Sequence, residues 1–131
     1  MRVLLLARHI QAYLSQFLCL ILHILFPFSF LPPFPLIPVF VDIERETRNI
    51  DPSEIKKCIT KKTKAILIVD YAGHACEIDE IKEIAKINNL YLIEDACHSM
   101  GGEYRGGKIG NFADMTIFSF HPLKHITTGE G

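Results

Sequence analysis

The stretch that decides the fold is AILIVD, residues 65–70. Its consecutive apolar residues show no polar alternation, which predicts a strand buried on both faces, as in a parallel sheet covered by helices. Just upstream, Asp51, Pro52 and Glu54 have the pattern of a helix N-terminus: an N-cap, a proline at the first helical position and a capping-box acid. We therefore expect a helix from Pro52 to about Ile59 that leads into this strand.

Three further segments have the composition of strands, namely residues 39–43 (VFVDI), 90–94 (LYLIE) and 115–120 (MTIFSF). Between the predicted strands at residues 65–70 and 90–94, Asp79 is expected to cap a helix that stops at Asn88-Asn89. One stripe of this helix consists of Ile81, Ile84, Ala85 and Asn88. The glycine-rich residues 101–110 (GGEYRGGKIG) predict turns. Because strands alternate with helices, the expected class is α/β, with parallel βαβ units.

Size and charge restrict the class of partner. The 131 residues are enough for one domain with a core of its own. The net charge is -1, and no block of lysines or arginines stands out. This balance suggests neither nucleic acid nor an anionic membrane surface as a partner, and instead favours a small molecule.

The four cysteines are unevenly spaced and include no C-x-x-C pair. This spacing indicates reduced thiols and a cytoplasmic location. Cys97 lies two residues after Asp95 and has no partner base in the sequence, so we interpret it as a small residue at a strand end.

Residues 1–37 do not resemble the rest of the chain. No Asp, Glu, Lys or Arg lies between His9 and Val41, and five of the seven prolines fall there. The apolar run at residues 12–26 is shorter than the about 20 residues that a membrane span needs, and no A-x-A-like cleavage site follows it. Two interpretations remain open: a segment translated out of frame, or a genuine hydrophobic leader. Residues 38–131 form the expected domain.

Polar residues follow three of the predicted strands: Asp70-Tyr71, residues 94–98, and residues 119–124. The carboxyl ends of parallel strands meet at one edge of a sheet, where ligands collect, so these clusters are expected to converge. Taken singly, Asp95 has the pattern of a turn-capping acid and Lys124 that of a solvated lysine.

Four segments together resemble a known family: PVFVDI (38–43), KAILIVDYAG (64–73), LIEDACHS (92–99) and FSFHPLKHITTGEG (118–131). They are similar to the DegT/DnrJ/StrS-type sugar-nucleotide aminotransferases, which use pyridoxal phosphate and have the aspartate-aminotransferase-like fold. The resemblance implies a partial large domain, a mostly parallel sheet with flanking helices, truncated after the lysine motif. The last segment is closest to the aminotransferases of pseudaminic-acid synthesis.

The resemblance also implies an activity and partners. The activity is transfer of an amino group, from an amino-acid donor such as glutamate, to the C4 keto group of a UDP-linked 4-keto-6-deoxy sugar, for cell-surface or nonulosonic-acid sugars. The full-length family is expected to form homodimers. The resemblance further implies that some sugar-dehydrating relatives carry His where this chain has Lys124, so the lysine favours transamination.

Site residues follow from the same motifs. Lys124 matches the Schiff-base lysine, and Asp95 matches the carboxylate that keeps the pyridine nitrogen protonated. His98 matches a residue placed near the ring and its phenolic oxygen. Ser119 matches a hydroxyl that contacts the cofactor phosphate. The resemblance implies no metal, and the histidines on either side of Lys124 receive no role.

The family's phosphate-binding turn normally precedes the PVFVDI strand, where this chain has LILHILFPFSFLPPFPLI. We therefore expect the chain alone to bind pyridoxal phosphate weakly and to be inactive. The competing hypotheses are a non-catalytic remnant with a membrane-associated N-terminus and a pyridoxal-phosphate enzyme for a different nucleotide sugar.

Overall fold

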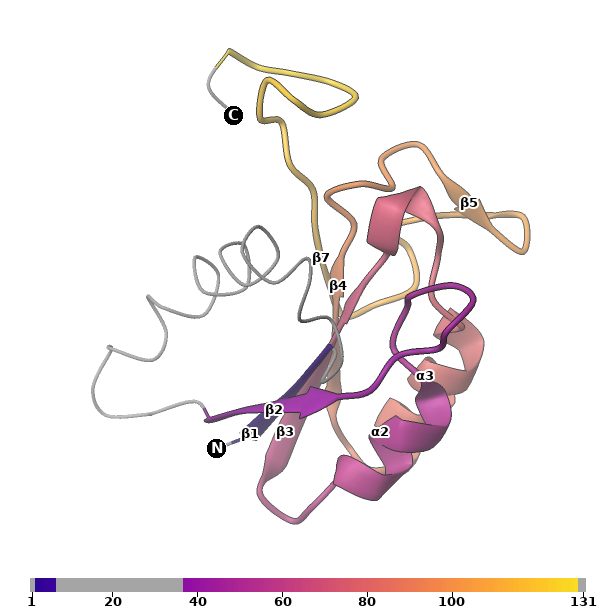
Figure 1. Cartoon of the computed structure of the whole chain (residues 1–131), viewed down its shortest axis with the longest axis vertical. Helices are drawn as coiled ribbons and strands as arrows, with labels where there is room; N and C mark the ends of the chain where they lie inside the picture. Colours follow the sequence, from indigo (N-terminus) through magenta and orange to yellow (C-terminus); the bar gives the residue numbers. More distant parts are fainter. Residues whose placement is uncertain (1, 7–36, 130–131) are drawn as a thin grey trace.

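A computed structural model of the chain describes residues 2–6 and 37–129 (Figure 1). A five-stranded sheet with the order β2-β1-β3-β4-β7 forms its centre, and every neighbouring pair of these strands is parallel. The strands are β1 (Arg2–Leu6), β2 (Ile37–Val41), β3 (Thr63–Val69), β4 (Tyr91–Asp95) and β7 (Met115–Ile117). The α/β class with parallel strands, expected from the sequence, is confirmed.

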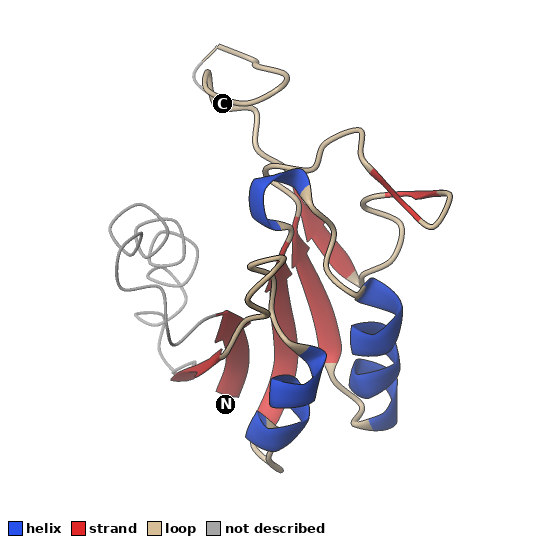
Figure 2. Ribbon diagram, turned by 45° about the vertical axis from the view of Figure 1, so that its right-hand side comes forward, coloured by secondary structure: helices blue, strands red, loops and turns tan. Residues whose placement is uncertain are grey.

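Helices α2 (Pro52–Cys58) and α3 (Ile78–Ile87) lie on the same face of the sheet (Figure 2). Each belongs to a crossover that moves in the same direction across the sheet, from β2 over β1 to β3 and then to β4. Because parallel crossovers are right-handed, two crossovers in one direction place their helices on one face.

The core forms between these helices and the sheet. Ile66 and Ile68 of β3 are fully buried, as are Ile55 of α2 and Ile81 of α3. All five residues from Ala65 to Val69 are buried, so the burial predicted for the AILIVD strand is confirmed.

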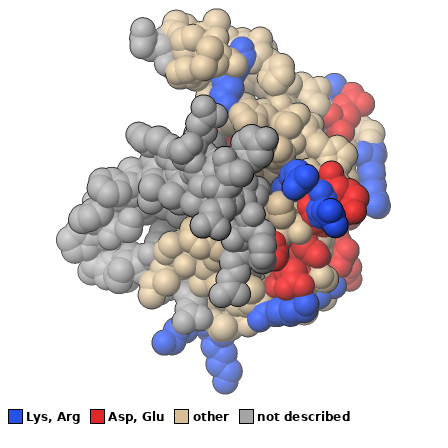
Figure 3. All heavy atoms as spheres, in the orientation of Figure 1, with Lys and Arg blue, Asp and Glu red and all other residues tan. Residues whose placement is uncertain are grey.

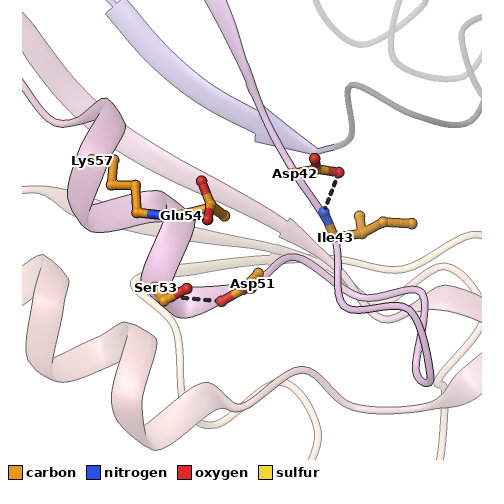
Figure 4. A network of polar contacts seen from close by, with 6 residues as sticks. All are labelled: Asp42, Ile43, Asp51, Ser53, Glu54 and Lys57. Carbon is orange, nitrogen blue, oxygen red and sulfur yellow. Dashed lines mark hydrogen bonds and ion pairs between the residues drawn. The ribbon is translucent and has the colours of Figure 1, made fainter.

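The start of α2 follows the prediction only in part. Asp51 is the N-cap, and its Oδ1 accepts a hydrogen bond from the backbone N–H of Ser53 at 2.7 Å (Figure 4). The reciprocal contact of a capping box is replaced by others. The N–H of Asp51 donates to the carbonyl of Asp42 at 3.0 Å, and Glu54 forms an ion pair with Lys57.

The prediction that Asp79 caps the next helix is wrong. Helix α3 begins at Ile78, and Glu77 occupies the N-cap position. Asp79 lies in the first turn, where its carboxylate accepts a hydrogen bond from Arg105 at 2.9 Å. At the other end, the expected stop is confirmed: Asn88 is the C-cap, although this fourth residue of the predicted stripe is exposed.

The turn-rich segment forms a small hairpin of β5 (Glu103–Tyr104) and β6 (Gly107–Lys108). Three contacts join it to the start of α3: Arg105 with Asp79, Arg105 with Glu77 at 3.7 Å, and the Tyr104 hydroxyl with Glu77 at 3.3 Å. Figure 3 shows acidic and basic side chains intermixed over the helical side of the molecule, without a large area of one sign in this view.

The strand β1 lies inside the sheet, paired with both β2 and β3, where the sequence analysis predicted no strand. The apolar segment at residues 7–36, including the run at 12–26, lies outside the described residues. Among the helices of the described part, none is long and apolar enough to cross a bilayer.

Candidate cofactor site

Strands β3, β4 and β7 end at the same level, at the edge of the sheet where the carboxyl ends of the strands lie. Asp95 is in register with Val69 of β3 and with Ile117 of β7. Beyond this level, the N–H of Asp70 donates to the carbonyl of Asp95 at 3.1 Å, and the N–H of Ala96 donates to that of Ile117 at 2.9 Å. The polar clusters after β3, β4 and β7 therefore leave the sheet side by side, as the sequence predicted.

One carboxylate oxygen of Asp95 accepts a hydrogen bond, and the other has no donor among the described residues. The side chain is 1% exposed, and its Oδ1 accepts the backbone N–H of Cys97 at 3.0 Å. Its Oδ2 has no hydrogen-bond partner among the described residues. A buried carboxylate oxygen without a donor is costly, so this atom suits a ligand that brings an N–H group, and a positively charged one best.

A pocket of ≈ 520 Å³ lies beyond this edge and is lined by Ala72, His98, Leu123, Lys124 and His125. Lys124 reaches it from the segment after β7 (residues 118–129), which we call the lysine loop. The N–H of Lys124 donates to the carbonyl of His121 at 2.8 Å, and this tight turn presents the lysine. The pocket thus combines residues from the loops after β3, β4 and β7.

Because these residues lie close together, they change each other's pKa values. Burial lowers the pKa of His98, and the charge of Lys124 lowers it further, while Asp95 opposes them. Burial, followed by its contact with Asp95, raises the pKa of the Cys97 thiol to about 12, and Lys124 opposes this shift. The neutral imidazole is therefore favoured at His98, and Cys97 is a buried thiol.

Ser119 is placed differently from the other expected residues. It is half-buried, it is not among the residues that line the pocket, and its Oγ accepts the N–H of His121 at 3.4 Å. His121 is exposed, and its Nδ1 accepts the N–H of Leu123 at 3.3 Å. Ser119 and His121 thus shape the lysine loop, whereas His125, which received no role from the sequence, lines the pocket.

Two further buried carboxyl groups lie close to this edge. Glu94 is fully buried; its Oε2 accepts the Thr116 hydroxyl at 2.9 Å, and its Oε1 has no partner in the described part of the chain. Asp70 is also fully buried; its Oδ1 accepts the N–H of Cys76 at 3.1 Å, and its Oδ2 is likewise unpartnered. Burial raises the pKa of both groups.

These two acids face away from the Asp95 side chain. Successive side chains of a strand alternate between faces, so Glu94 points to the face opposite Asp95. Asp70 follows Val69, the register partner of Asp95, and so shares the face of Glu94. The sequence analysis included Glu94 in the polar cluster at residues 94–98 but gave a role only to Asp95 and His98.

The sequence and the fold of this chain are similar to those of known proteins. Residues 34–131 match the DegT/DnrJ/EryC1/StrS aminotransferase family. The chain belongs to this family. For such a chain, the sequence motifs predicted that Lys124 and Asp95 hold the cofactor.

Individual relatives include both aminating and dehydrating enzymes. The chain is 46% identical, over 95 residues, to the UDP-4-amino-4,6-dideoxy-N-acetyl-beta-L-altrosamine transaminase of Campylobacter jejuni, a match that covers 70% of this chain and 25% of the relative. It is 48% identical, over 96 residues, to the dTDP-4-dehydro-2,6-dideoxy-D-glucose 3-dehydratase of Saccharopolyspora spinosa, covering 73% of this chain and 21% of the relative. The chain therefore spans about a quarter of the length of these relatives.

A solved structure agrees with the fold. The Helicobacter pylori aminotransferase PseC, described as involved in the biosynthesis of pseudoaminic acid, superimposes with a TM-score of 0.79 and 30% sequence identity. The match covers 98% of this chain and 31% of that one. The expected partial large domain of the aspartate-aminotransferase-like fold is confirmed.

Proposed function

We propose that this chain carries the lysine-bearing part of the cofactor site of an aminotransferase that acts on a nucleotide sugar. Pyridoxal phosphate is the cofactor of this family. The observation that carries the proposal is that buried Asp95 has an Oδ2 without a hydrogen-bond partner among the described residues. Asp95 lies three residues before His98, and His98 lines the pocket together with Lys124. The residues present fit the cofactor, because they offer an anion to a ring nitrogen and an amine to an aldehyde.

When bound, pyridoxal phosphate supplies an electron sink and a carrier for the amino group. Asp95 Oδ2 would accept the hydrogen bond of a protonated pyridine nitrogen, and its negative charge would stabilise that positive charge. Lys124 Nζ would be the amine that holds the cofactor, and as a free amine it would take up and return a proton at its nitrogen.

The remaining expected residues have supporting roles in the proposal. His98 would lie beside the ring and its phenolic oxygen, and its lowered pKa favours a neutral imidazole that could donate or accept one hydrogen bond there. The Ser119 Oγ accepts from the N–H of His121, so its hydroxyl proton stays available for a phosphate oxygen.

The reaction is the transfer of an amino group from glutamate to the C4 keto group of a UDP-linked 4-keto-6-deoxy sugar, in a homodimer. Similarity to the Campylobacter jejuni transaminase supports this substrate class. The similarity to a dehydratase is equally high. Lys124 is what favours amination, because the family resemblance implies that some sugar-dehydrating members carry His at this position.

Covalent labelling tests the cofactor site in the chain itself. Pyridoxal phosphate is added, the linkage is reduced with borohydride, and the labelled peptide is identified by mass. Because reduction makes the bond permanent, weak binding is sufficient. We expect the label on Lys124, its loss in Lys124→Ala, and no effect of Lys61→Ala, an exposed lysine in the turn between α2 and β3. Labelling spread evenly over surface lysines would contradict a built site.

A chimera tests the reaction. Residues 37–131 replace the matching segment of the Campylobacter jejuni transaminase, and 2-oxoglutarate formation is measured with glutamate and UDP-, GDP- or dTDP-linked 4-keto-6-deoxy sugars. We expect turnover with the UDP-linked sugar that Lys124→Ala abolishes. Dehydration of the sugar without formation of 2-oxoglutarate would favour the dehydratase alternative.

A further inference from the structure

A buried amide lies behind the pocket, outside the set of residues that the sequence motifs identified. Asn49 follows β2 in a turn closed by a hydrogen bond from the N–H of Glu44 to the carbonyl of Asn49 at 2.9 Å. The residue is 2% exposed. Its Oδ1 accepts the N–H of Tyr71 at 3.0 Å, and its Nδ2 donates to the carbonyl of His74 at 2.8 Å. One side chain thus binds both ends of the turn at residues 71–74.

The 71–74 turn has a backbone that needs support. Ala72 has φ 54 and ψ 25, and Gly73 follows with φ +86, so two successive residues adopt left-handed conformations. For a residue with a Cβ this conformation is unfavourable. Such backbone persists when surrounding contacts determine it, and the two hydrogen bonds of Asn49 are contacts of that kind.

This turn contacts the proposed site at two points. Ala72 lines the pocket together with Lys124 and His98. Gly73 packs against the backbone of His98 so closely that a Cβ at this position would lie 3.0 Å from the His98 carbonyl oxygen. A hydrogen bond also joins Ser99 to the residue before the turn: the Ser99 Oγ donates to the carbonyl of Asp70 at 3.4 Å.

We propose that Asn49 is a positioning residue for the cofactor site: by binding both ends of the 71–74 turn, it holds the Ala72 wall of the pocket and the backbone of His98. The inference rests on the proposed function, because it assigns a role in building that site. Asn49 itself does not line the pocket, so it acts only through the turn.

Loss of the Asn49 amide would remove the two side-chain hydrogen bonds that hold the 71–74 turn. In Asn49→Ala, the N–H of Tyr71 and the carbonyl of His74 lose these hydrogen bonds, and Ala72 can return to a more common conformation. The backbone of His98 then loses its close neighbour, and its imidazole gains access to water. Both the pocket wall and the protonation of His98 change as a result.

The test follows the titration of His98 by NMR in the chain without cofactor, with the signal assigned by His98→Gln. The charged and titratable groups that act on this imidazole are Lys124, Asp95 and His125. Burial and Lys124 lower the pKa of His98 in the native chain. We expect Asn49→Ala to raise this pKa toward its ordinary value, because burial is the main cause of the shift.

A second variant, Gly73→Ala, tests the same contact in case Asn49→Ala does not fold. Gly73→Ala acts on the same contact from the exposed side, since its new Cβ presses on the His98 carbonyl. The matched control is Gly106→Ala, which has a similar φ of +83 but no neighbour within 4 Å of the new Cβ. Asn88→Ala is the control for the amide, because it removes a hydrogen bond to the Ile84 carbonyl at the far end of α3.

The outcomes separate this inference from the proposed function. An upward shift in Asn49→Ala or Gly73→Ala that is absent from both controls, with several-fold slower labelling of Lys124 by pyridoxal phosphate, supports the positioning role. An unchanged His98 titration in both variants, or an equal shift in the controls, overturns it. If native chain fails to label at Lys124 while the His98 shifts occur as expected, the proposed function fails and the structural link between Asn49 and His98 remains.

Discussion

Glu94 of β4 and Thr116 of β7 are joined by a hydrogen bond of 2.9 Å, from the threonine hydroxyl to Oε2 of a fully buried carboxyl group. This bond connects the strand that ends in Asp95 to the strand that leads to Lys124. Burial, as the main cause, raises the pKa of Glu94, and the Thr116 hydroxyl partly offsets that shift. The pair therefore connects the two halves of the proposed site and makes their junction sensitive to pH.

Glu94→Gln should make stability less dependent on pH. The folded-state pKa of Glu94 is raised above the ordinary 4.5, so between these two values the folded state binds more protons than the unfolded state. Stability then falls as the pH rises through this range. Glutamine keeps an acceptor for Thr116 and carries no charge, so the stability of the variant relative to native chain should rise as the pH increases from acid to neutral. Urea unfolding at several pH values measures this, and parallel stability curves would contradict it.

Asp70 contributes a slope of the same sign, because burial also raises its pKa. Some pH dependence should thus remain in Glu94→Gln. The double variant with Asp70→Asn should show less than either single variant.

Thr116→Val should destabilise the chain by about 1–3 kcal/mol, since it leaves Glu94 Oε2 without its hydroxyl donor in a buried place. The matched control is Thr127→Val in the exposed lysine loop, where the hydroxyl donates to the Gly129 carbonyl at 3.3 Å. We expect the control to change the free energy of unfolding by less than about 0.5 kcal/mol. Equal effects of the two substitutions would show that the buried bond has no special weight.

Asp95→Asn should separate chemistry from folding. The amide can keep the bond to the Cys97 N–H with its oxygen, but it cannot stabilise a positive ring nitrogen. In the chimera we expect turnover to fall by orders of magnitude, with a milder loss in His98→Asn. Asp79→Asn, which alters an exposed carboxylate bonded to Arg105, is the control and should leave turnover unchanged. Turnover near the native value in Asp95→Asn would remove Asp95 from the proposed site.

The sequence predicted those parts of the molecule that local patterns determine. The continuous apolar run at 65–70 identified β3, and the residues Asp51 and Pro52 correctly located the start of α2 at Pro52. Asp95, His98 and Lys124 were predicted from motifs that resemble the family's, and the parallel topology brings the strand ends that precede these residues together.

Other features depend on contacts between distant segments and leave no local signal. Asp79 has the pattern of a helix cap, but Arg105 of the hairpin binds its carboxylate instead. The last strand was expected to reach Phe120 but ends at Ile117, where the chain turns toward the lysine loop. Asn49 is an ordinary loop residue in the sequence, and only the fold brings it to the turn 22 residues later.

The cysteines offer a test of the distance between Cys97 and Lys124. Cys97 and Cys76 are buried, and burial raises the pKa of both thiols, that of Cys97 to about 12, whereas Cys58 is half-buried at the end of α2. In a Cys19→Ser chain, we expect a small thiol reagent to modify Cys58 first, because only the thiolate reacts and access is needed.

Lys124→Met keeps a long side chain but removes the positive charge that lowers the pKa of Cys97. The thiolate fraction of Cys97 should then fall, and its modification should become slower relative to that of Cys58, which serves as the internal reference. Peptide mass analysis at several times and pH values gives the ratio, and the difference should shrink at high salt because screening weakens the charge effect. Faster modification of Cys97 would mean that the lysine protects it by covering it, and an unchanged ratio would place the ammonium group too far away to serve a site that includes Asp95.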